Sequence, residues 1–476
     1  MQRGTVCIFC NQIIIVKRLS LYILLLLLAV SCSEKPDTNG DAPSVVDQFV
    51  CYGTPFEDVP SVDDMRIYSL SPRSFAKENA FKAMTARLDS IKMLNVNVIW
   101  VLPVFLKSET RQPYGSPYSM RDFYQLDPEY GTIADLREFV REAHSRGIAV
   151  ILDLVTKHTG SDSQWLKTHP DWYLMKDTFT SSSFSPESFI DPAEFDWTNR
   201  ELRNELVKLM KYWIAIANID GYRCDSASVL PEEVWSEAIA SLREYYKDRK
   251  LIMLAEAAQA SYLAAGFDLN YGWHFGATLE KVFSGEWTVN SLFTKNEEEM
   301  TSAAESGTGK GRMRFSTNHD YTARNAPSSL YNSQAGADAA FVIALTMGGV
   351  PMVYASQEIG YPQKLSFFKN NAVVMDWNSN PETFGLYCTL MNLASDPVLR
   401  LGTLTKITND GVVSFVREYN DQKILVLVNV KGVTSEFTLP SDYTNGEYVD
   451  MLTGENFRFS TDHLNAYSYH ILKVVR

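Results

Sequence analysis

Short apolar runs alternate with longer amphipathic runs along most of this 476-residue sequence. The run IAVILDLV (148–155) has the length and continuous hydrophobicity of a strand buried on both faces. The run NRELRNELVKLMKYWIAIAN (199–218) has the period of an amphipathic helix. Strands that alternate with helices of this length indicate βα units and a parallel sheet.

The alternation predicts a (β/α)8 TIM barrel, because eight strand-like runs alternate with helical stretches. Barrels of this kind take about 250 residues, and insertions lengthen them. We therefore assign the barrel to residues 61–402. The eight predicted strands are MRIYSL, NVIWVLP, IAVILDLV, DGYRCD, KLIMLAEA, FDLNYGW, MRFSTNHD and VPMVYAS.

Two segments do not follow the alternation. Residues 159–197, between the third strand and its helix, are rich in Ser, Asp, Pro and Trp, and are read as a short inserted domain. From Thr403 the helical period stops, and runs such as VVSFVREY and KILVLVNV are separated by turns containing Asn-Asp-Gly or Asn-Gly. Residues 403–476 are therefore predicted to form a C-terminal all-β sandwich domain.

The N-terminus has the features of an export signal. Lys17 and Arg18 precede an apolar run that is short for a transmembrane helix and ends in LAVSC at Cys32. A cysteine directly after small residues resembles the lipobox of bacterial lipoproteins, which predicts a signal peptide over 1–31, a lipid on Cys32 and a polar tether over 32–60. The protein would then be exported and lipid-anchored to a bacterial membrane. The leaflet stays open, the outer-membrane cell surface included, and ordinary signal cleavage is the alternative.

Charge and cysteine content exclude other classes. The formal net charge of −13 argues against a nucleic-acid partner, because phosphate binding needs a basic face. Cys7 and Cys10 form half of a metal-binding pattern with no second half. The remaining cysteines are too few and too widely spaced for a disulfide framework.

Polar side chains gather at the predicted carboxyl ends of the strands, which is where barrel enzymes carry their active sites. Each residue taken alone could belong to a structural ion pair. Together they would bring carboxylates, histidines and an arginine to one mouth: Asp153 and His158 after the third strand, Arg223 and Asp225 after the fourth, Glu256 after the fifth, and Asn318, His319 and Asp320 after the seventh.

Asp225 and Glu256 would end neighbouring strands, which lie about 4.8 Å apart. Their carboxyl groups could then lie roughly 5–5.5 Å apart, the separation that retaining glycosidases use. Arg223, two residues before Asp225 and on the same face of the strand, would keep that carboxylate ionised. The apolar neighbours of Glu256 should raise its pKa, as a general acid requires.

Four motifs in order, DLVTKH (153–158), GYRCD (221–225), LAEA (254–257) and FSTNHD (315–320), together with GVPMVYASQEIG (349–360), resemble those of glycoside hydrolase family 13, the α-amylase superfamily. The resemblance runs from Asp64 to the C-terminus. It implies that Asp225 is the nucleophile, Glu256 the acid/base and Asp320 the third carboxylate. It further implies a structural role for Asp153 and a sugar-binding role for Tyr118, His158, Arg223 and His319.

The sequence departs from the family in places. Lys157 stands where the family usually carries an Asn that contributes to a calcium site, and the other usual calcium positions are not matched either, so no cofactor or metal is expected to be required. Ser228 and Val229 replace the Lys-His pair that often follows the nucleophile.

We therefore expect a retaining α-glucan hydrolase, α-amylase-like, that cleaves α-1,4-glucosidic bonds of starch or maltooligosaccharides. An α-glucosidase or glucanotransferase of the same family is the alternative, and a non-catalytic carbohydrate-binding protein on the same fold is the alternative from a different class. The sequence leaves open the choice between α-1,4 and α-1,6 bonds, endo or exo action, hydrolysis or transfer, and the oligomeric state.

Overall fold

The computed structural model describes residues 49–110, 115–174, 193–368 and 372–475. The predicted signal peptide, Cys32, most of the predicted tether and the centre of the insertion lie outside these residues. Within them, no helix has both the length and the apolar character needed to span a bilayer.

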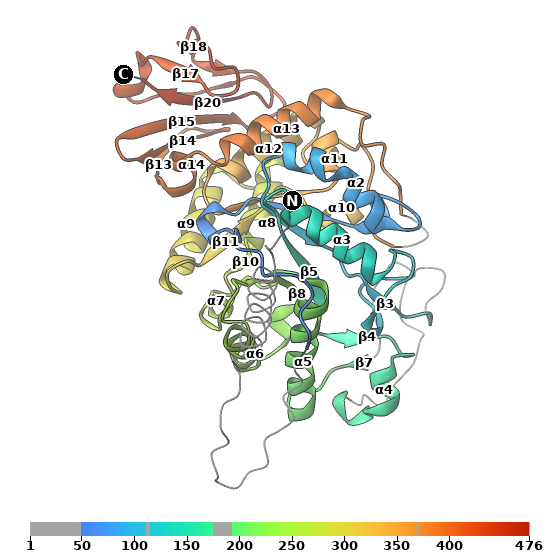
Figure 1. Ribbon diagram of the computed structural model, residues 1–476. Coiled ribbons are helices and arrows are strands. Elements are labelled where there is room, and N and C mark those ends of the chain that lie inside the picture. Colours follow the sequence, from blue (N-terminus) through green and yellow to red (C-terminus); the bar gives the residue numbers. More distant parts are fainter. Residues whose placement is uncertain (1–48, 111–114, 175–192, 369–371, 476) are drawn as a thin grey trace, which may run out of the picture. The chain divides into compact units, whose positions relative to one another are not determined.

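Eight parallel strands close into a barrel, which confirms the predicted fold class (Figure 1). Around the barrel the strands are hydrogen-bonded in the order β1-β12-β11-β10-β9-β8-β5-β2. Barrel strands that are consecutive along the chain are therefore neighbours in the barrel. Each of the eight segments predicted as strands overlaps a barrel strand, although the seventh does so only at Met313 and Arg314. The barrel strands are β1 (Ile67–Leu70), β2 (Val98–Val101), β5 (Ala149–Val155), β8 (Gly221–Asp225), β9 (Ile252–Ala255), β10 (Leu269–Tyr271), β11 (Gly311–Arg314) and β12 (Val350–Tyr354).

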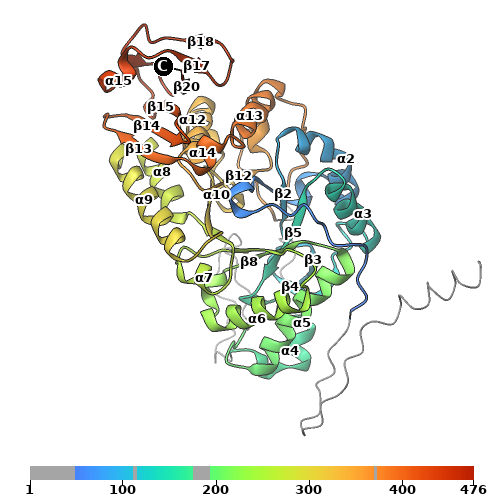
Figure 2. The ribbon, with the colours of Figure 1, turned by 60° about the vertical axis from the view of Figure 1, so that its left-hand side comes forward.

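Helices surround the barrel (Figure 2). Local signals start them: Thr132 and Asp135 form a reciprocal cap on α3, and the Asn199 side chain accepts from two backbone amides of α5. The longer helices are α2 (Ala80–Met93), α3 (Ile133–His144), α5 (Arg200–Ala217), α6 (Glu232–Tyr245), α8 (Trp273–Phe283), α9 (Val289–Glu305), α12 (Gln334–Thr346) and α13 (Pro381–Leu393). Short helices are α7 (Ser261–Ala264), α10 (His319–Arg324), α11 (Pro327–Leu330) and α14 (Pro397–Leu401), with 3-10 turns η1 (Val62–Asp64), η2 (Pro72–Ser74), η4 (Ala227–Val229) and η5 (Gln357–Ile359).

Gly221 allows β8 to lie close to β9. Its φ is +142°, and a Cβ at this position would come within 1.9 Å of the Ile252 carbonyl oxygen. Only glycine fits both the backbone conformation and the contact. The register that follows pairs Cys224 with Ala255, so that Asp225 and Glu256 end up at adjacent strand ends.

Two excursions leave the barrel at its carboxyl end. After β2 the chain forms an antiparallel hairpin of β3 (Phe105–Lys107) and β4 (Met120–Leu126), which the sequence reading did not predict. After β5 comes the predicted insertion, of which the structure describes β6 (His158–Thr159), α4 (Gln164–Thr168), η3 (Pro170–Trp172) and β7 (Ala193–Glu194). β6 and β7 pair antiparallel and bring the two ends of the insertion together.

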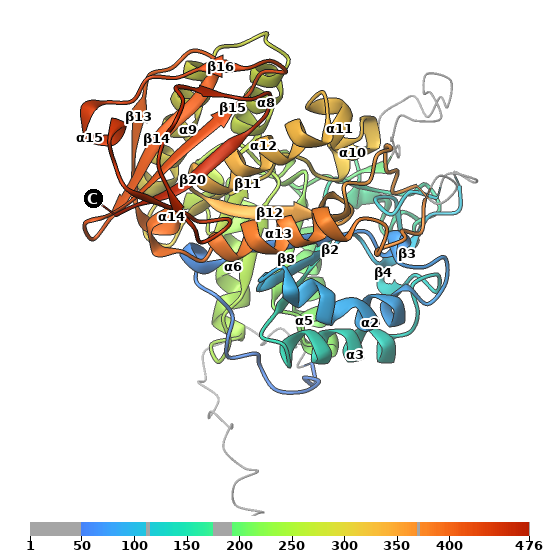
Figure 3. The ribbon, with the colours of Figure 1, turned by 90° about the horizontal axis from the view of Figure 1, so that it is seen from above.

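The C-terminal residues form the predicted antiparallel β domain (Figure 3). Its main sheet has six strands in the order β13-β14-β15-β20-β17-β18, and a separate pair joins β16 and β19. The strands are β13 (Thr403–Ile407), β14 (Val412–Tyr419), β15 (Gln422–Asn429), β16 (Ser435–Glu436), β17 (Tyr448–Asp450), β18 (Asn456–Phe457), β19 (His463–Leu464) and β20 (Tyr469–Val474), with helix α15 (Ser441–Thr444) between β16 and β17.

The two faces of this main sheet bury different apolar sets, as side chains that alternate along a strand should. On β15, Val426 and its neighbours two positions away belong to the barrel's apolar core. Leu425 and Leu427 belong to a second core together with Leu464 of β19. The sheet therefore packs on the barrel helices with one face and on the small β16–β19 pair with the other.

The first described residues pack against the barrel's amino end. The Tyr52 amide donates to the Ala215 carbonyl (2.7 Å) at the end of α5, and the Asn218 side chain donates to the Thr54 carbonyl (2.9 Å). Phe56 stacks on His144, the last residue of α3, with ring centroids 4.4 Å apart. Because α5 ends just before β8 begins, these contacts lie at the opposite end of β8 from Asp225.

Candidate active site

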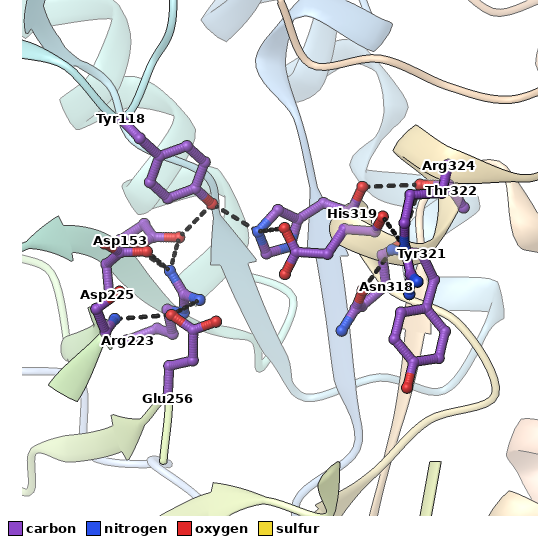
Figure 4. Close-up of polar contacts among 12 residues, drawn as sticks. Tyr118, Asp153, Arg223, Asp225, Glu256, Asn318, His319, Tyr321, Thr322 and Arg324 are labelled. Carbon is purple, nitrogen blue, oxygen red and sulfur yellow. Dashed lines mark hydrogen bonds and ion pairs between the residues drawn. The ribbon is translucent and has the colours of Figure 1, made fainter. Parts of the chain in front are cut away.

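A buried ion pair between β5 and β8 is the centre of the candidate site (Figure 4). Asp153 and Arg223 are register partners on these strands, and both side chains are fully buried. Arg223 Nη1 lies 2.8 and 2.9 Å from the two carboxylate oxygens of Asp153. Its Nε donates to the hydroxyl of Tyr271 on β10 (3.1 Å). The guanidinium is thereby fixed from both sides of the barrel interior.

The same guanidinium also contacts both predicted catalytic carboxyl groups. Nη1 donates to Asp225 Oδ1 at 3.0 Å, and Nη2 forms an ion pair with Glu256 Oε2 at 2.8 Å. The backbone amide of Ser226 donates to that same Glu256 oxygen at 2.7 Å. Ser226 takes a left-handed conformation (φ 46°), which turns the chain directly after Asp225. Asp225 and Glu256 therefore converge on one point of the barrel mouth, as the sequence predicted.

Burial raises the pKa of both carboxyl groups. The pKa of Glu256 rises to about 8, mainly through burial, and Arg223 opposes the rise. The pKa of Asp225 rises to about 6, again mainly through burial, with Asp153 and Asp320 adding repulsion and Arg223 opposing it. Arg223 lowers the pKa of Asp225, as expected, but desolvation outweighs the arginine, so the net shift is upward. The predicted order holds, since Glu256 keeps its proton to a higher pH than Asp225.

Tyr118 and His319 extend this network to the far side of the mouth (Figure 4). The Tyr118 hydroxyl donates to Asp153 Oδ2 at 3.0 Å and lies 2.9 Å from His319 Nε2. Burial lowers the pKa of His319 to about 4, so the ring is neutral at pH 7. Since the single Tyr118 proton goes to Asp153, His319 donates from Nε2 and carries an acceptor lone pair on Nδ1. That Nδ1 is buried and has no hydrogen-bond partner among the described residues.

The remaining predicted residues lie on segments that follow the strands. Asp320 was expected at the end of the seventh strand, but β11 ends at Arg314, and Asp320 lies in the first turn of α10, which the Asn318 side chain caps. Its side chain is 42 % exposed and lies 3.6 Å from His319. His158 is buried at the start of β6, where its backbone pairs with Glu194.

Sequence reasoning missed several residues that shape the site. The Trp100 indole donates to Asp153 Oδ2 (3.1 Å), and its ring lies 4.9 Å from the Arg223 guanidinium carbon. The Phe367 ring meets Tyr118 and His319 edge-on, with centroid distances of 5.5 and 5.6 Å. Trp100 lies in an apolar run and Phe367 in a mixed segment, and no motif marks either residue. The alternation of β2 could have placed Trp100 inside the barrel, but nothing in the sequence brings Phe367 to this wall.

Lys157 occupies the position discussed above for a cation ligand. Its ammonium lies 3.9 Å from Glu194 Oε1, across the β6–β7 pair that closes the insertion. Within the described parts of the chain, no three His, Cys, Asp or Glu side chains gather in a way that could hold a metal ion.

Comparison with known proteins agrees with this geometry. Residues 69–383 match the family model described as alpha amylase, catalytic domain. The chain belongs to the α-amylase family. Residues 403–471 match the C-terminal domain of maltogenic amylase, which corresponds to the six-stranded sheet and its small partner. As a member of this family the protein is a glycoside hydrolase of the amylase type.

Individual relatives are distant. Alpha-amylase 2 of Dictyoglomus thermophilum is 26% identical over 415 residues, 82% of this chain and 70% of that protein. Alpha-amylase MalA of Haloarcula japonica is also 26% identical, and the match covers 83% of this chain but only 60% of that protein. The structure of a noncanonic maltogenic α-amylase, AmyB of Thermotoga neapolitana, superimposes with a TM-score of 0.76 at 22% identity, covering 88% of this chain and all of the other.

Other relatives in the family carry different names. They include a trehalose synthase of Thermus thermophilus (24% identical over 507 residues) and an oligo-1,6-glucosidase of Parageobacillus thermoglucosidasius (27% over 199 residues). Family membership alone therefore does not select one bond or one product.

Proposed function

We propose that this amylase-family protein hydrolyses α-1,4-glucosidic bonds of starch or maltooligosaccharides with retention of configuration. The observation that carries the proposal is the convergence of Asp225 and Glu256 on one buried guanidinium from neighbouring strands. Their pKa values, about 6 and about 8, leave one carboxyl ionised and the other protonated near neutral pH. A nucleophile paired with a proton donor is what double displacement requires.

In the first step, an ionised oxygen of Asp225 attacks the anomeric carbon and forms a glycosyl ester. The bond from that carbon to the leaving oxygen breaks, and the Glu256 proton moves to the leaving oxygen. In the second step, Glu256, now ionised, takes a proton from water. The resulting hydroxide attacks the anomeric carbon, the ester bond breaks, and Asp225 is regenerated. Two inversions give net retention.

The remaining site residues would bind the sugar and stabilise the positive charge that develops on it. The exposed Asp320 carboxylate, beside His319 in the first turn of α10, offers acceptors to sugar hydroxyls. His319 Nδ1 is a buried acceptor that lacks a protein partner within the described residues, so a sugar hydroxyl would satisfy it. We further assign Tyr118 and Arg223 to the sugar pocket because both contact Asp153 beside Asp225, and His158 because it begins β6, the segment that follows β5.

The test is the anomer formed first. Asp225→Asn and Glu256→Gln should each remove turnover on soluble starch and keep the native circular dichroism spectrum. Proton NMR of the wild-type reaction should show the α-anomer before mutarotation. A β-anomer appearing first would contradict double displacement at Asp225.

A glucosidase or a glucanotransferase is the second candidate, because trehalose synthase and oligo-1,6-glucosidase relatives belong to the same family. Product profiles on soluble starch, maltotriose and pullulan separate these functions. Mixed short oligosaccharides from starch would support the amylase, glucose alone would support the glucosidase, and products longer than the substrate would support a transferase.

The third candidate, a carbohydrate-binding protein without activity, has less support, since the Asp225, Glu256 and Asp320 carboxyl groups are all present. It predicts that maltotriose binds to wild type without turnover. It also predicts that Glu256→Gln changes nothing.

We also propose that the protein is exported and lipid-anchored at Cys32, which lies outside the described residues. The support is the basic pair, the apolar run and the small residues before this cysteine. A diacylated cysteine anchors stably because it carries more than one chain. Wild type should sediment with membranes, and Cys32→Ala should be released or misprocessed. Wild type found wholly in the soluble fraction would refute the anchor, and protease shaving of whole cells would choose the leaflet.

A further inference from the structure

The packed rings of Tyr118, His319 and Phe367 are called the sugar-binding wall below. A buried charge network is connected to the segments that carry this wall and takes no part in the proposed bond cleavage. Lys107 Nζ lies 2.6 Å from Asp127 Oδ2 and 2.9 Å from Glu129 Oε2. Arg73 Nε donates to the other Glu129 oxygen at 2.8 Å. All four side chains are at most 9 % exposed. Burying four charges is costly unless each is paired and hydrogen-bonded, which is the arrangement found here.

Arg73 Nη2 donates to Glu129 Oε2 at 3.2 Å, which leaves Nη1 for two backbone carbonyls from different parts of the chain. Its Nη1 donates to the Gly115 oxygen at 2.7 Å and to the Phe367 oxygen at 2.8 Å. Arg73 itself lies in η2, directly after β1. Gly115 lies after β2 and Phe367 after β12, the two strands that flank β1 in the barrel. One guanidinium therefore joins the segments that follow three consecutive barrel strands.

Both anchored carbonyls belong to segments that carry the sugar-binding wall. Gly115 precedes Tyr118 by three residues, and the Tyr118 hydroxyl contacts both Asp153 and His319. The Phe367 ring packs edge-on against Tyr118 and against His319. A shift of either carbonyl would move a ring of this wall, because the packed rings leave little room for independent adjustment.

We propose that Arg73 is a positioning residue that sets substrate affinity at the sugar site by holding Tyr118 and Phe367 in contact with His319. It acts on binding of the sugar, and Asp225 and Glu256 remain the groups that break the bond. The planar guanidinium fork can bind a carboxylate and two carbonyls at once, whereas a lysine ammonium cannot reproduce that geometry. The inference rests on the proposed hydrolysis of α-glucans at this site.

The first test is Arg73→Lys, which keeps the charge and removes the fork. A second bond, from the Met375 amide to the Ser74 carbonyl (2.9 Å), also ties the segment after β12 to η2, so the fold should survive. With maltotriose as substrate, KM should rise about fivefold, as expected for loss of one or two hydrogen bonds, while kcat changes much less. In the Glu256→Gln background, calorimetry should show the same loss in maltotriose affinity.

Arg417→Lys is the matched control, because Arg417 is also a buried arginine that donates to a backbone carbonyl (Leu399, 2.8 Å) but lies in the C-terminal sheet. It should lower the melting temperature without changing KM. Equal KM values for wild type, Arg73→Lys and Arg417→Lys would overturn the inference. A wild type that does not turn over maltotriose or starch would instead refute the proposed function.

A second variant, Phe367→Leu, covers the case in which Arg73→Lys folds poorly, and where both variants fold a double-mutant cycle links the two residues. Phe367→Leu removes the ring on which Arg73 is proposed to act, and should by itself raise KM by a similar factor. If Arg73 acts through Phe367, the effects of the two substitutions on KM should be less than additive. Additive effects, or a Phe367→Leu variant with unchanged KM, would overturn the proposal that Arg73 sets substrate affinity by holding Phe367.

Discussion

Asp225 lies 3.0 Å from the Arg223 guanidinium, and yet the pKa of its carboxyl is raised to about 6. The arginine is shared with Asp153, whose two carboxylate oxygens lie 2.8 and 2.9 Å from the same Nη1. Burial therefore outweighs the nearest charge at Asp225, and it does so still more at Glu256. Desolvation raises the pKa of both groups and so moves the working pH range toward neutrality.

The pH dependence of kcat/KM follows from these two values. Asp225 must be ionised to attack, so activity should rise as pH increases through about 6. Glu256 must be protonated to donate, so activity should fall as pH increases through about 8. Initial rates on maltotriose well below KM, from pH 4 to 10, measure both limbs. Asp153 raises the pKa of Asp225, so Asp153→Asn should move the acid limb toward lower pH.

A profile that still rises above pH 9, or one with no fall on its alkaline side, would contradict the assignment of Glu256 as the proton donor. An acid limb that Asp153→Asn moves to higher pH would contradict the electrostatic account of Asp225.

Single-residue predictions succeeded where a polar side chain interrupts an apolar strand. Asp153, Arg223 and Asp225 could be placed at one mouth because strand alternation and barrel topology fix their directions. Ser226 could not be found this way, since its contribution is a backbone amide aimed by a left-handed turn. Arg73 and Phe367 meet only through long-range folding of loops, which no local pattern encodes.

At the scale of elements, the segment after β5 connects the insertion to the strand that carries Asp225. The Trp197 indole donates to the Thr156 carbonyl (3.1 Å), and the Thr156 hydroxyl donates to the Asp225 carbonyl (2.9 Å). The Phe195 amide donates to the Lys157 carbonyl (3.1 Å) in the same segment. The backbone of Asp225 is thus tied to the base of the insertion as well as to its sheet neighbours.

Thr156→Val tests this connection, because it removes the hydroxyl and nearly keeps the shape of the side chain. The Asp225 carbonyl loses a donor, and we expect kcat to fall several-fold as the carboxylate becomes less well positioned. Thr346→Val is the control, since Thr346 is a buried threonine of α12 that donates to the Val342 carbonyl (2.6 Å) away from the site. Both variants should lose about 1 kcal/mol of stability. Equal kcat values in the two variants would show that the connection is structural only.

Metal independence is a second prediction about the insertion. The Lys157 ammonium lies 3.9 Å from Glu194 Oε1, and an ammonium cannot serve as the oxygen ligand that a calcium ion would need from this residue. Dialysis against EDTA should leave both the activity on starch and the melting temperature unchanged. Losses of either that calcium restores would establish a cation site that these residues do not predict.

Element prediction worked best for the barrel, since buried parallel strands read as continuous apolar runs. The β3–β4 hairpin was missed because its pairing is irregular and its first strand has only three residues. Asp320 was assigned to the wrong element for a different reason. Asn318 caps helix α10, which begins at His319. An Asn followed by a helical stretch is a signal for a helix start, and it could have placed Asp320 in the first turn of a helix.

At the scale of the whole described molecule, the C-terminal sheet shares an apolar core with the barrel. Val426 of β15 belongs to the same buried cluster as the barrel strands and α12. Arg417 of β14 donates to the Leu399 carbonyl of α14, which adds a polar contact to this interface. The sheet and the barrel should therefore unfold as one cooperative unit.

Val426→Asp tests this coupling. It places a carboxylate in the shared core, where an unpaired buried charge is strongly destabilising. We expect the temperature at which activity is lost to fall by about 10 °C or more. Gln422→Asp, an exposed position on the same strand, should leave that temperature unchanged. If Val426→Asp melts the sheet while the activity survives to the wild-type temperature, the barrel is stable on its own.

The contacts of Tyr52, Thr54 and Phe56 with the ends of α5 and α3 hold the start of the described chain at the amino end of the barrel strands. Anything joined to the chain ahead of Phe49 is attached at the pole opposite the catalytic carboxyl groups. We therefore expect a support or fusion partner joined at this point to leave the approach of a polymeric substrate open. Attachment through the C-terminal sheet would not place the support at this end of the barrel. Immobilisation by the amino end should therefore preserve rates on insoluble granules better than immobilisation by the carboxyl end.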